Sequence, residues 1–491
     1  MAEKKQQSMT SYCIKLLICL LFMFAFRYIP GWHGITPNGM SAIGIFIGLV
    51  LMIVFNFGLI QATCLAIFAV VSTGFYTGST VIGQTIGNNT VVQMFFIFAV
   101  CNSLIATGAG EFIAKWLLSR KWIQGKPVLF CSMLLFVGWL CGPFMGTAGL
   151  ILLYNILDYV DDTLGIEHSD SFSMMIRLGC QTMCMLGMAF LPFKGIALSI
   201  FNTINNAVIE AGYQCNYALY MIASFCISLI FAIGFLILML KIFKDNVQPL
   251  KDLDITKMEG MQNIKSTKHQ RVAIIVTLIT IAYTLVSLIL GTKSPFGKWF
   301  GNISLWVWGA LMLSIIGLLR VEGKPVVSPD ALMSKIQWGI TLATAAFTVV
   351  GGMISNPDLG VRTWINDVLS PIFTGMSFPV FLLIVVLASS IITNFFSNMA
   401  TGLIIGSLIV GFAITYCQNL GVNPTFIALA LVQGSFFAYL TMAAAGPAPL
   451  LLAQPAYVNN PGFIWKRGVP VLIWGMICNW GICLLFSFIA G

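Results

Sequence analysis

The chain has 491 residues, of which 58% are hydrophobic and only 8% are charged. A soluble domain usually carries about 25% charged residues, and so few charges could not cover the surface of a soluble fold. The composition therefore excludes a soluble enzyme or binding domain and predicts an all-α polytopic membrane protein. The net charge of +9 does not indicate nucleic-acid binding, because the basic residues border apolar runs, where they set the orientation in the membrane.

Cysteine and histidine give no sign of a disulfide framework or a metal centre. The 13 cysteines lie mostly inside apolar runs and form no CxxC pair, and buried cysteine behaves as a small hydrophobe. The three histidines, His33, His168 and His269, fall in predicted loops that are too scattered for a metal cluster. We therefore expect neither a metal centre nor an organic cofactor.

The apolar runs predict about eleven transmembrane helices. The first, Ile14–Ile29, continues into bulky aromatic residues without a signal-peptide cleavage site, so we expect it to be retained. The predicted spans cover residues 13–30, 39–57, 59–77, 90–108, 172–212, 217–242, 271–291, 301–319, 337–356, 424–457 and 469–490. Spans 172–212 and 424–457 are too long for a simple helix, so we expect both to be broken or tilted.

Two further apolar stretches, 127–160 and 376–416, carry small or polar residues at their middles. We interpret both as re-entrant hairpins, because this places the basic segment Lys241–Arg271 in the cytoplasm with most other lysines and arginines. If each stretch crossed the membrane once, that segment would lie outside. The hairpin interpretation predicts a multi-pass protein with a cytoplasmic N-terminus and an external C-terminus. The compact loops and the lack of organelle signals favour a bacterial inner membrane.

These segments divide the chain into two kinds of unit. Residues 1–126 and 271–375 are predicted to form a scaffold. Residues 127–242 and 376–491 are predicted to form two halves of a transport domain, each with a hairpin, a broken helix and a long span. The polar segment 243–270 is expected to be a cytoplasmic linker, because it is too short for a core of its own.

The two hairpin regions match each other in sequence and spacing. The hairpin tips are Phe144-Met-Gly-Thr-Ala-Gly-Leu-Ile and Phe396-Ser-Asn-Met-Ala-Thr-Gly-Leu-Ile, and helix breaks follow at Leu191-Pro-Phe-Lys-Gly and Ala444-Ala-Gly-Pro-Ala-Pro. The distance from Gly146 to Lys194 is 48 residues, as is that from Asn398 to Gly446. Matched interruptions in two halves are typical of secondary transporters. Because the two hairpins would enter from opposite faces, we expect two inverted repeats.

The interruptions predict an anion site in the middle of the membrane. Irregular backbone at this depth is tolerated where it lines a cavity, and helix N-termini there carry unsatisfied N–H groups and partial positive charge. The predicted substrate-binding residues are Gly146, Thr147, Lys194, Ser397, Asn398, Thr401, Gly446 and Pro447. Taken one by one, their polar side chains could equally serve as interhelical hydrogen-bond partners.

The unit of hairpin and broken helix, present twice from about Val81 to the C-terminus, resembles the divalent anion–sodium symporter family of the ion-transporter superfamily. The resemblance implies elevator-type transport of dicarboxylates, a homodimeric scaffold, and sodium bound beside the substrate at Ser-Asn-Thr hairpin tips. The cation site that it implies here comprises Ser397, Asn398, Ala445 and Gly446. The chain departs from the pattern at Met399, which replaces the tip threonine, and in the first tip, Met145-Gly-Thr. Sodium symport, proton coupling and sodium-independent exchange therefore remain alternatives.

Lys194 is the charged residue with the clearest functional position. It lies 17 residues after Arg177 and 16 before Glu210, which places it near mid-membrane. A charge at this depth indicates a functional site. Its ammonium group could act as a fixed positive charge in place of sodium, contact a substrate carboxylate, or carry a proton. The alternative is a lysine that snorkels to the membrane interface or forms a structural ion pair.

Other charges are expected at helix ends. Glu111 and Lys115 have the spacing of a surface ion pair. Glu210 is expected to end a helix at the outer face, with a role in gating or proton transfer as the alternative. The carboxylates that close the first hairpin are expected to be solvated: Asp158, Asp161 and Asp162.

The sequence favours a secondary active transporter of small divalent anions, most of all C4-dicarboxylates, that holds its substrate between the hairpin tips and Lys194. The alternative is a cation/proton antiporter or an anion channel on a related scaffold, although an antiporter should carry intramembrane carboxylates in its broken helices. An enzyme is excluded, because the spans lack paired carboxylates and histidines. The expected partners are a small anion, the lipid bilayer and a second copy of the chain, with no nucleic acid.

Overall fold

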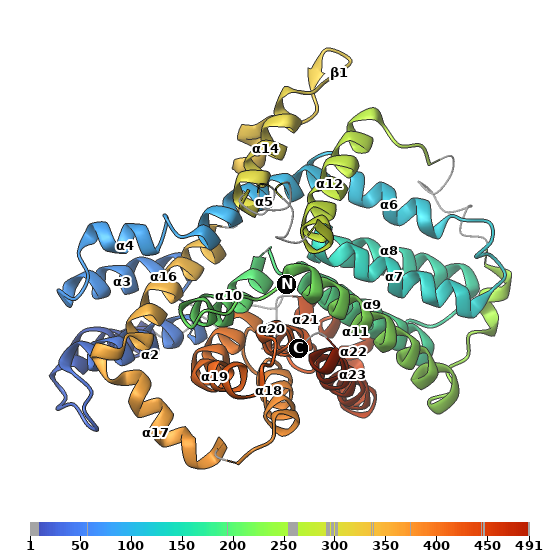
Figure 1. The fold of residues 1–491 in the computed structure, drawn as a ribbon. Helices are drawn as coiled ribbons and strands as arrows, with labels where there is room; N and C mark the ends of the chain where they lie inside the picture. Colours follow the sequence, from blue (N-terminus) through green and yellow to red (C-terminus); the bar gives the residue numbers. More distant parts are fainter. Residues whose placement is uncertain are drawn as a thin grey trace.

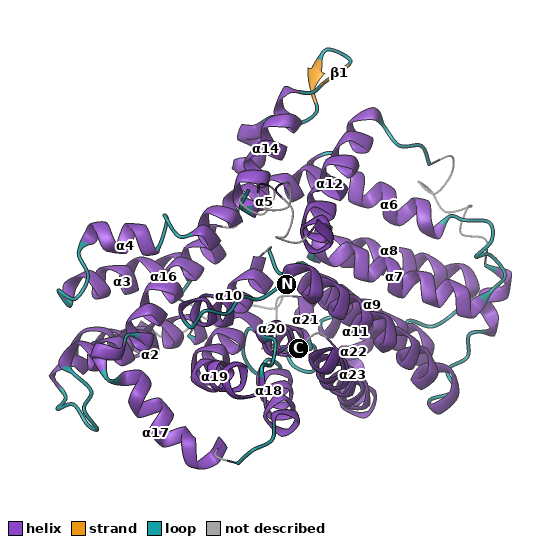
Figure 2. Cartoon of the chain, in the orientation of Figure 1, coloured by secondary structure: helices purple, strands orange, loops and turns teal. Residues whose placement is uncertain are grey.

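The fold is almost entirely helical (Figure 2). The computed structural model describes residues 9–55, 57–193, 195–253, 264–290, 295, 299, 303–334, 336, 338–373, 375–442, 444 and 447–489. Within these residues the strands are β1 (Arg320–Val321) and β2 (Lys324–Pro325), which pair antiparallel in a small hairpin. The predicted all-α class is confirmed.

The helices follow the predicted order of apolar runs. The N-terminal part contains α1 (Met9–Leu20), α2 (Pro37–Val54), α3 (Leu59–Ser72), α4 (Gly78–Gln84), α5 (Asn89–Ala106), α6 (Ala109–Leu118), α7 (Pro127–Met145), α8 (Thr147–Leu164), α9 (Ser171–Phe190), α10 (Gly195–Glu210) and α11 (Tyr217–Ile237). The C-terminal part contains α12 (Lys268–Leu290), α14 (Leu305–Leu318), α15 (Pro329–Met333), α16 (Trp338–Ser355), α17 (Val361–Phe373), α18 (Phe378–Ile392), α19 (Asn398–Leu420), α20 (Pro424–Phe436), α21 (Pro447–Leu452), α22 (Pro455–Asn459) and α23 (Val469–Ile489). Short π and 3₁₀ segments extend α1, α11 and α23: Leu21–Ala25, Phe26–Tyr28, Leu238–Ile242 and Ile464–Gly468.

Every predicted span contains a helix. Of the described helices, six are long and apolar enough to cross a membrane, or up to eight if each of two bent pairs forms one span. The bent pairs are α5 with α6, at 55°, and α9 with α10, at 50°. Of five shorter apolar helices, α3, α14, α16 and α20 occupy other predicted spans, and α18 lies in the second predicted hairpin. The multi-pass character is therefore confirmed, whereas the number of eleven spans stays a prediction.

Polar caps and glycines set the helix boundaries. Helix α2 begins after Thr36, whose Oγ1 accepts a hydrogen bond from the Gly39 amide at 3.1 Å. Helix α9 begins after Asp170, whose carboxylate accepts from the Phe172 amide at 2.8 Å. Helix α19 ends at Gly421, with a φ of 64° that favours glycine.

Both predicted hairpins are present as helix pairs joined by tight turns. Helices α7 and α8 meet at Gly146 and lie side by side (Figure 1). Helices α18 and α19 are joined by residues 393–397 and pack against each other. Each pair is followed by a helix, a break and a further helix, as the matched spacing predicts.

The first hairpin packs closely on α9 through glycines. A Cβ atom on Gly142 of α7 would lie 2.2 Å from the Cys184 carbonyl oxygen, and one on Gly187 of α9 would lie 2.0 Å from that of Trp139. Only glycine permits such an approach of two backbones. Helices α7 and α9 therefore touch backbone to backbone.

The apolar side chains form separate clusters. One joins α2, α3 and α16 and includes Met399 and Leu403 of α19, and another joins α5, α12 and α14. The largest is built mainly from α7–α11 and α18–α23. The groups meet where α10 packs against α16 and α5.

Asp161 at the end of the first hairpin is fully buried, so the expectation of a solvated carboxylate is wrong at this position. Its Oδ2 accepts hydrogen bonds from Arg177 Nη1 at 2.8 Å and from Ser173 Oγ at 2.6 Å. Arg177, itself 2% exposed, also donates to Asp158 at 2.6 Å. Asp162 is exposed, as expected. Burial of Asp161 follows from its pairing with an arginine on α9, because a buried charge requires a partner.

Other expectations for charged residues have mixed outcomes. Lys115 Nζ lies 2.6 Å from Glu111 Oε1, so the predicted pair on α6 is confirmed. Glu210 is the last residue of α10 and is exposed, which confirms a helix end. His269 lies in the first turn of α12 and not in a loop, so that expectation is wrong. Part of the polar linker, residues 254–263, lies outside the described residues.

Candidate functional site

A cavity of about 340 Å³ lies where the two hairpin tips meet. We call it the hairpin cavity. Its walls come from the α7–α8 turn, the facing ends of α9 and α10, the starts of α19 and α21, and single turns of α5, α16 and α20. The lining residues are Asn102, Ile105, Gly142, Pro143, Phe144, Met145, Gly146, Thr147, Ala148, Met185, Met188, Gly195, Ile196, Ile340, Asn398, Phe436 and Pro447. Its volume lies within the range of roughly 300–1,000 Å³ that is usual for small-molecule sites.

Four helices begin at this cavity. Thr147, Gly195, Asn398 and Pro447 are the first residues of α8, α10, α19 and α21, and all four line it. The N-terminus of a helix presents unbonded N–H groups and a partial positive charge. Helix α21 contributes little of this, because it has six residues and neither Pro447 nor Pro449 carries a backbone N–H. The convergence therefore makes the hairpin cavity favourable for an anion.

The structure brings together half of the predicted substrate-binding residues. Gly146, Thr147, Asn398 and Pro447 line the hairpin cavity, and the Thr147 side chain is exposed. The remaining described residues lie beside it. Ser397 Oγ accepts a hydrogen bond from the Ala400 amide at 3.2 Å and so caps α19.

Thr401, also predicted to bind substrate, lies one turn into α19. Its side chain is fully buried, and within the described residues its Oγ1 has no hydrogen-bond partner. Thr401 is not among the residues that line the hairpin cavity.

Three predicted residues lie outside the described part of the chain: Lys194, Ala445 and Gly446. Their immediate neighbours Gly195 and Pro447 both line the hairpin cavity. A role for Lys194 in substrate binding, and for Ala445 and Gly446 in cation binding, therefore stays a prediction.

The turn of the second hairpin contains a buried asparagine that the sequence did not single out. Asn394 Nδ2 donates to the carbonyl oxygens of Ser390 and Phe437, both at 2.8 Å. Its Oδ1 accepts from the amides of Tyr439 and Leu440, at 2.9 and 2.8 Å. One side chain thus ties the hairpin turn to the irregular segment after α20. The feature of the sequence that could have identified Asn394 is its position as a polar residue within an apolar run, four residues before Asn398.

The neighbouring Thr393 connects the same turn to the cavity. Its Oγ1 lies 2.6 Å from the Ser435 carbonyl oxygen and 3.1 Å from Asn398 Oδ1. Thr393 therefore orients the Asn398 amide, which lines the cavity. Like Asn394, it was not among the predicted residues.

The rest of the wall is uncharged. Three methionines, Met145, Met185 and Met188, surround the first tip, and none of the described lining residues carries a charge. Asn102 of α5, whose Nδ2 donates to the Leu332 carbonyl oxygen at 3.3 Å, adds a polar group from the predicted scaffold. In an uncharged wall, backbone dipoles act on a bound ion with less screening than in water.

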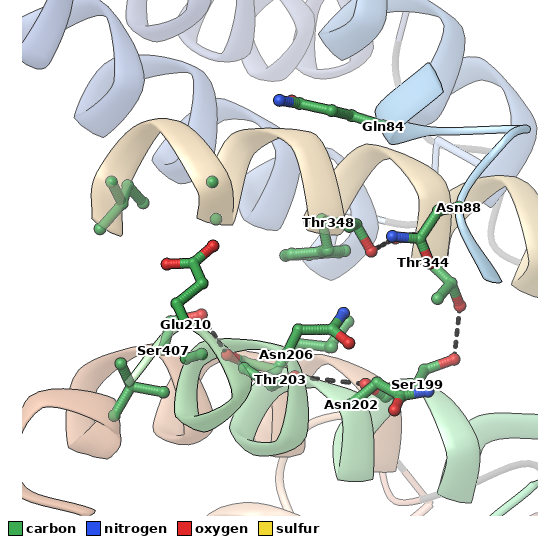
Figure 3. A pocket seen from close by; sticks show the side chains of 17 residues that line it. Gln84, Asn88, Ser199, Asn202, Thr203, Asn206, Glu210, Thr344, Thr348 and Ser407 are labelled. Atoms are coloured by element: carbon green, nitrogen blue, oxygen red, sulfur yellow. Dashed lines mark hydrogen bonds between the residues drawn. The ribbon is translucent and has the colours of Figure 1, made fainter. Parts of the chain in front are cut away.

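A second cavity, of about 220 Å³, lies farther along α10. We call it the polar cavity. Figure 3 shows the amide and hydroxyl side chains of α10 facing those of α16 across it. At one end, Ser199 Oγ and Thr344 Oγ1 are hydrogen-bonded at 2.5 Å; Glu210 lies at the other end. The sequence did not indicate this cavity, because its walls come from distant segments.

Comparison with known proteins identifies the class of molecule to which this fold and cavity belong. The family model of CitMHS, described as a citrate transporter, matches residues 13–434, which is most of the chain. The chain belongs to the CitMHS citrate transporter family. It is therefore a membrane transporter and not an enzyme, and the predicted transporter class is confirmed. The narrower resemblance to a dicarboxylate–sodium symporter stays a prediction. Comparison with the curated proteins finds no match.

Solved structures support the fold of this CitMHS chain. The YdaH transporter of Alcanivorax borkumensis aligns with a TM-score of 0.55 and 13% identity, over 84% of this chain and 88% of that one. MtrF of Neisseria gonorrhoeae, described as one of a class of antimetabolite efflux pumps, aligns with a TM-score of 0.59 and 13% identity, over 98% of this chain and 95% of that one. At this identity the similarity shows the fold alone.

Replacing Gly146 by alanine should reduce transport by at least about tenfold while leaving the protein folded. Its φ of 57° and ψ of −130° are sparsely populated by residues with a side chain, at a cost of about 1–3 kcal/mol. The turn would relax and displace the start of α8. Uptake into proteoliposomes is the measurement, with Gly481→Ala on α23, where a Cβ meets no atom within 4 Å, as the control. Wild-type uptake by the Gly146 variant would contradict the expectation.

Proposed function

We propose that this CitMHS chain is a secondary active transporter of small carboxylate anions, with citrate and C4-dicarboxylates as the substrates to test first. The observation that carries the proposal is the convergence of three helix N-termini, those of α8, α10 and α19, on the hairpin cavity. The family description supports citrate. Helix N-termini select for negative charge, and the polar groups Thr147 and Asn398 add hydrogen-bonding capacity for a carboxylate.

The transport cycle that we propose is elevator-like. Helices α7–α11 and α18–α23 would move as the transport domain against a scaffold of α1–α5 and α12–α16, in an inverted repeat. The apolar clusters support this division in part. The cluster of α2, α3 and α16 also includes Met399 and Leu403 of α19, and the largest cluster also includes Ile97 and Cys101 of α5. The scaffold would form a homodimer in a cell membrane, with the N-terminus cytoplasmic and the C-terminus outside, following the distribution of lysine and arginine.

For coupling, we propose that Lys194 supplies a fixed positive charge beside the substrate. Its neighbour Gly195 lines the cavity, and the described wall has no other charge. Such a charge would make exchange without sodium possible. Sodium symport through Ser397, Asn398, Ala445 and Gly446 is the competing form of the same function.

Uptake of labelled citrate and of labelled succinate into proteoliposomes tests the function. Each is measured with and without a sodium gradient, and with and without the unlabelled anion inside. Saturable uptake of either anion supports the proposal, and the condition that drives it identifies the coupling. No uptake of either anion under any of these conditions would contradict the assignment to small carboxylates.

Replacing Lys194 by alanine is expected to abolish uptake, because the bound carboxylates would lose their only side-chain counter-charge among the proposed binding residues. Lys194→Arg, which keeps the positive charge, should retain measurable uptake. Both variants are compared at equal reconstituted amounts. Undiminished uptake by Lys194→Ala would show that the ammonium group takes no part in transport.

A further inference from the structure

The two cavities lie in series along the same three helices. On α10, Ile196 lines the hairpin cavity and Asn202 lines the polar cavity one to two turns later. On α16, Ile340 lines the hairpin cavity and Thr344 lines the polar cavity. On α19, Asn398 lines the hairpin cavity and Ser407 lines the polar cavity. The polar cavity therefore continues the hairpin cavity toward the Glu210 end of α10.

The polar cavity contains an unpaired hydrogen-bond donor. Asn202 is 4% exposed, and its Nδ2 has no hydrogen-bond partner within the described residues. Its Oδ1 accepts from Asn205 Nδ2 at 3.4 Å. The unpaired Nδ2 is shielded from solvent, so a ligand in the cavity reaches it only when the side chain turns. A buried donor without a partner costs free energy, and an acceptor that enters the cavity removes this cost.

The surrounding groups are suited to a transient carboxylate. Asn206 adds an amide from α10, and Thr348 lies on the opposite side of the cavity (Figure 3). The Thr348 hydroxyl already donates to the Thr344 carbonyl oxygen at 2.8 Å, so the free donors are amides. Of the described lining residues, Glu210 alone is charged, and it is exposed at the far end. Neutral donors bind a carboxylate more weakly than a lysine or arginine would. Weak binding allows a substrate to leave again toward the hairpin cavity.

A hydrogen bond lies at the end of the polar cavity nearer to the hairpin cavity in the sequence of α10 and α16. Ser199 Oγ of α10 and Thr344 Oγ1 of α16 lie 2.5 Å apart, and both residues are 2% exposed. Ile196 and Ile340, one turn earlier on the same helices, line the hairpin cavity beside this contact. Helix α10 belongs to the proposed transport domain and α16 to the proposed scaffold. The bond therefore joins the two parts that would move relative to each other.

On the basis of the proposed function, we infer that the polar cavity is an access chamber. A carboxylate of the substrate binds Asn202 Nδ2 there before it reaches the hairpin cavity. The Ser199–Thr344 hydrogen bond closes the passage between the two cavities and breaks when α10 moves along α16. Asn202 is thus a further substrate-binding residue, and Ser199 and Thr344 form the contact that controls passage.

The kinetic test uses two variants of Asn202 and labelled citrate or succinate, whichever the wild type transports. Asn202→Leu removes the donor, and we expect KM to rise about tenfold with kcat within about twofold of wild type, which corresponds to one hydrogen bond to a charged group. Asn202→Gln keeps an amide and should restore most of the loss. Thr415→Val on an exposed part of α19 is the control for a polar-to-apolar change. Unchanged KM in Asn202→Leu would overturn the inference, although wild-type uptake would still support the proposed function.

A labelling test does not depend on turnover by an Asn202 variant. The background replaces by serine the three native cysteines that are not buried, Cys13, Cys64 and Cys226. Asn206→Cys in this background should react with a membrane-impermeant anionic methanethiosulfonate, and the substrate anion should slow the reaction. Ile340→Cys, beyond the Ser199–Thr344 bond, should react at least about tenfold more slowly. Adding Ser199→Ala and Thr344→Ala should remove most of this difference.

Two labelling results would overturn the inference. One is equal reactivity of Asn206→Cys and Ile340→Cys with the hydrogen bond intact. The other is reactivity of Asn206→Cys that the substrate anion does not change, which would show that the polar cavity holds water only. Failure of the proposed function is distinguishable, because the wild type would then neither take up citrate or succinate nor show protection by them.

Discussion

Replacing Asn394 by alanine is expected to reduce transport to background and to destabilise the protein by about 3–6 kcal/mol, since buried groups that lose a hydrogen-bond partner cost about 1–3 kcal/mol each. The Asn394 side chain makes four hydrogen bonds of 2.8–2.9 Å to backbone groups. Three of these groups, in Phe437, Tyr439 and Leu440, lie in irregular backbone that has no helical partner for them. The turn and the segment after α20 would therefore separate, and the start of α19 at the hairpin cavity would move.

Uptake into proteoliposomes and the thermal unfolding temperature of the purified protein measure these effects. The matched control is Ser390→Ala, one turn earlier on α18. The Ser390 side chain is also fully buried, but its Oγ has no hydrogen-bond partner within the described residues, so its removal should leave both quantities near wild type. Equal behaviour of the two variants would show that the Asn394 amide does not hold the turn.

The second large effect is expected at Arg177. Arg177→Met leaves Asp161 fully buried without its cationic partner, and breaking a buried ion pair in this way costs about 3–5 kcal/mol. The first hairpin would loosen at its base, because the pair joins α8 to α9. Thermal unfolding of the purified protein should show a large drop in the unfolding temperature. Lys115→Met, which breaks the more exposed pair with Glu111, should cost less than about 1 kcal/mol.

A double variant separates the loss of the pair from general damage. Asp161→Asn in the Arg177→Met protein removes the buried charge, so we expect it to recover most of the lost stability. Asp158 needs no replacement, because half of its side chain is exposed. If the double variant were less stable than Arg177→Met, the cost would come from lost packing and not from an unpaired carboxylate.

The hairpins and their tips are predictable from local sequence. Gly146 interrupts a long apolar run, and the equal spacing from each tip to the following break predicts both turns. Thr147, Asn398 and Pro447 are accordingly expected at one site, and they line one cavity. A helix break depends on a few neighbouring residues, so its position can be predicted from local sequence.

The remaining features depend on partners far away in the sequence. Asn102 and Ile340 enter the hairpin cavity from α5 and α16, which no local pattern connects to the hairpins. The sequence predicts a solvated Asp161, because it does not show that Arg177 reaches this carboxylate from the next helix. In the sequence, Asn394 resembles any polar residue that forms an interhelical hydrogen bond. Its special role depends on the path of the backbone after α20, which brings the Phe437 and Leu440 backbone groups to its side chain.

The backbone contact between α7 and α9 bears on how the transport cycle can be followed spectroscopically. Gly142 and Gly187 leave no space between these helices, so neither can slide or tilt against the other without separating. Spin labels placed across this pair should report one unchanging distance in every state. A pair of labels with one on α10 and the other on α16 lies across the boundary between the proposed transport domain and the proposed scaffold. Because these two parts move relative to each other during the cycle, the distance distribution should contain one population for each orientation of the transporter.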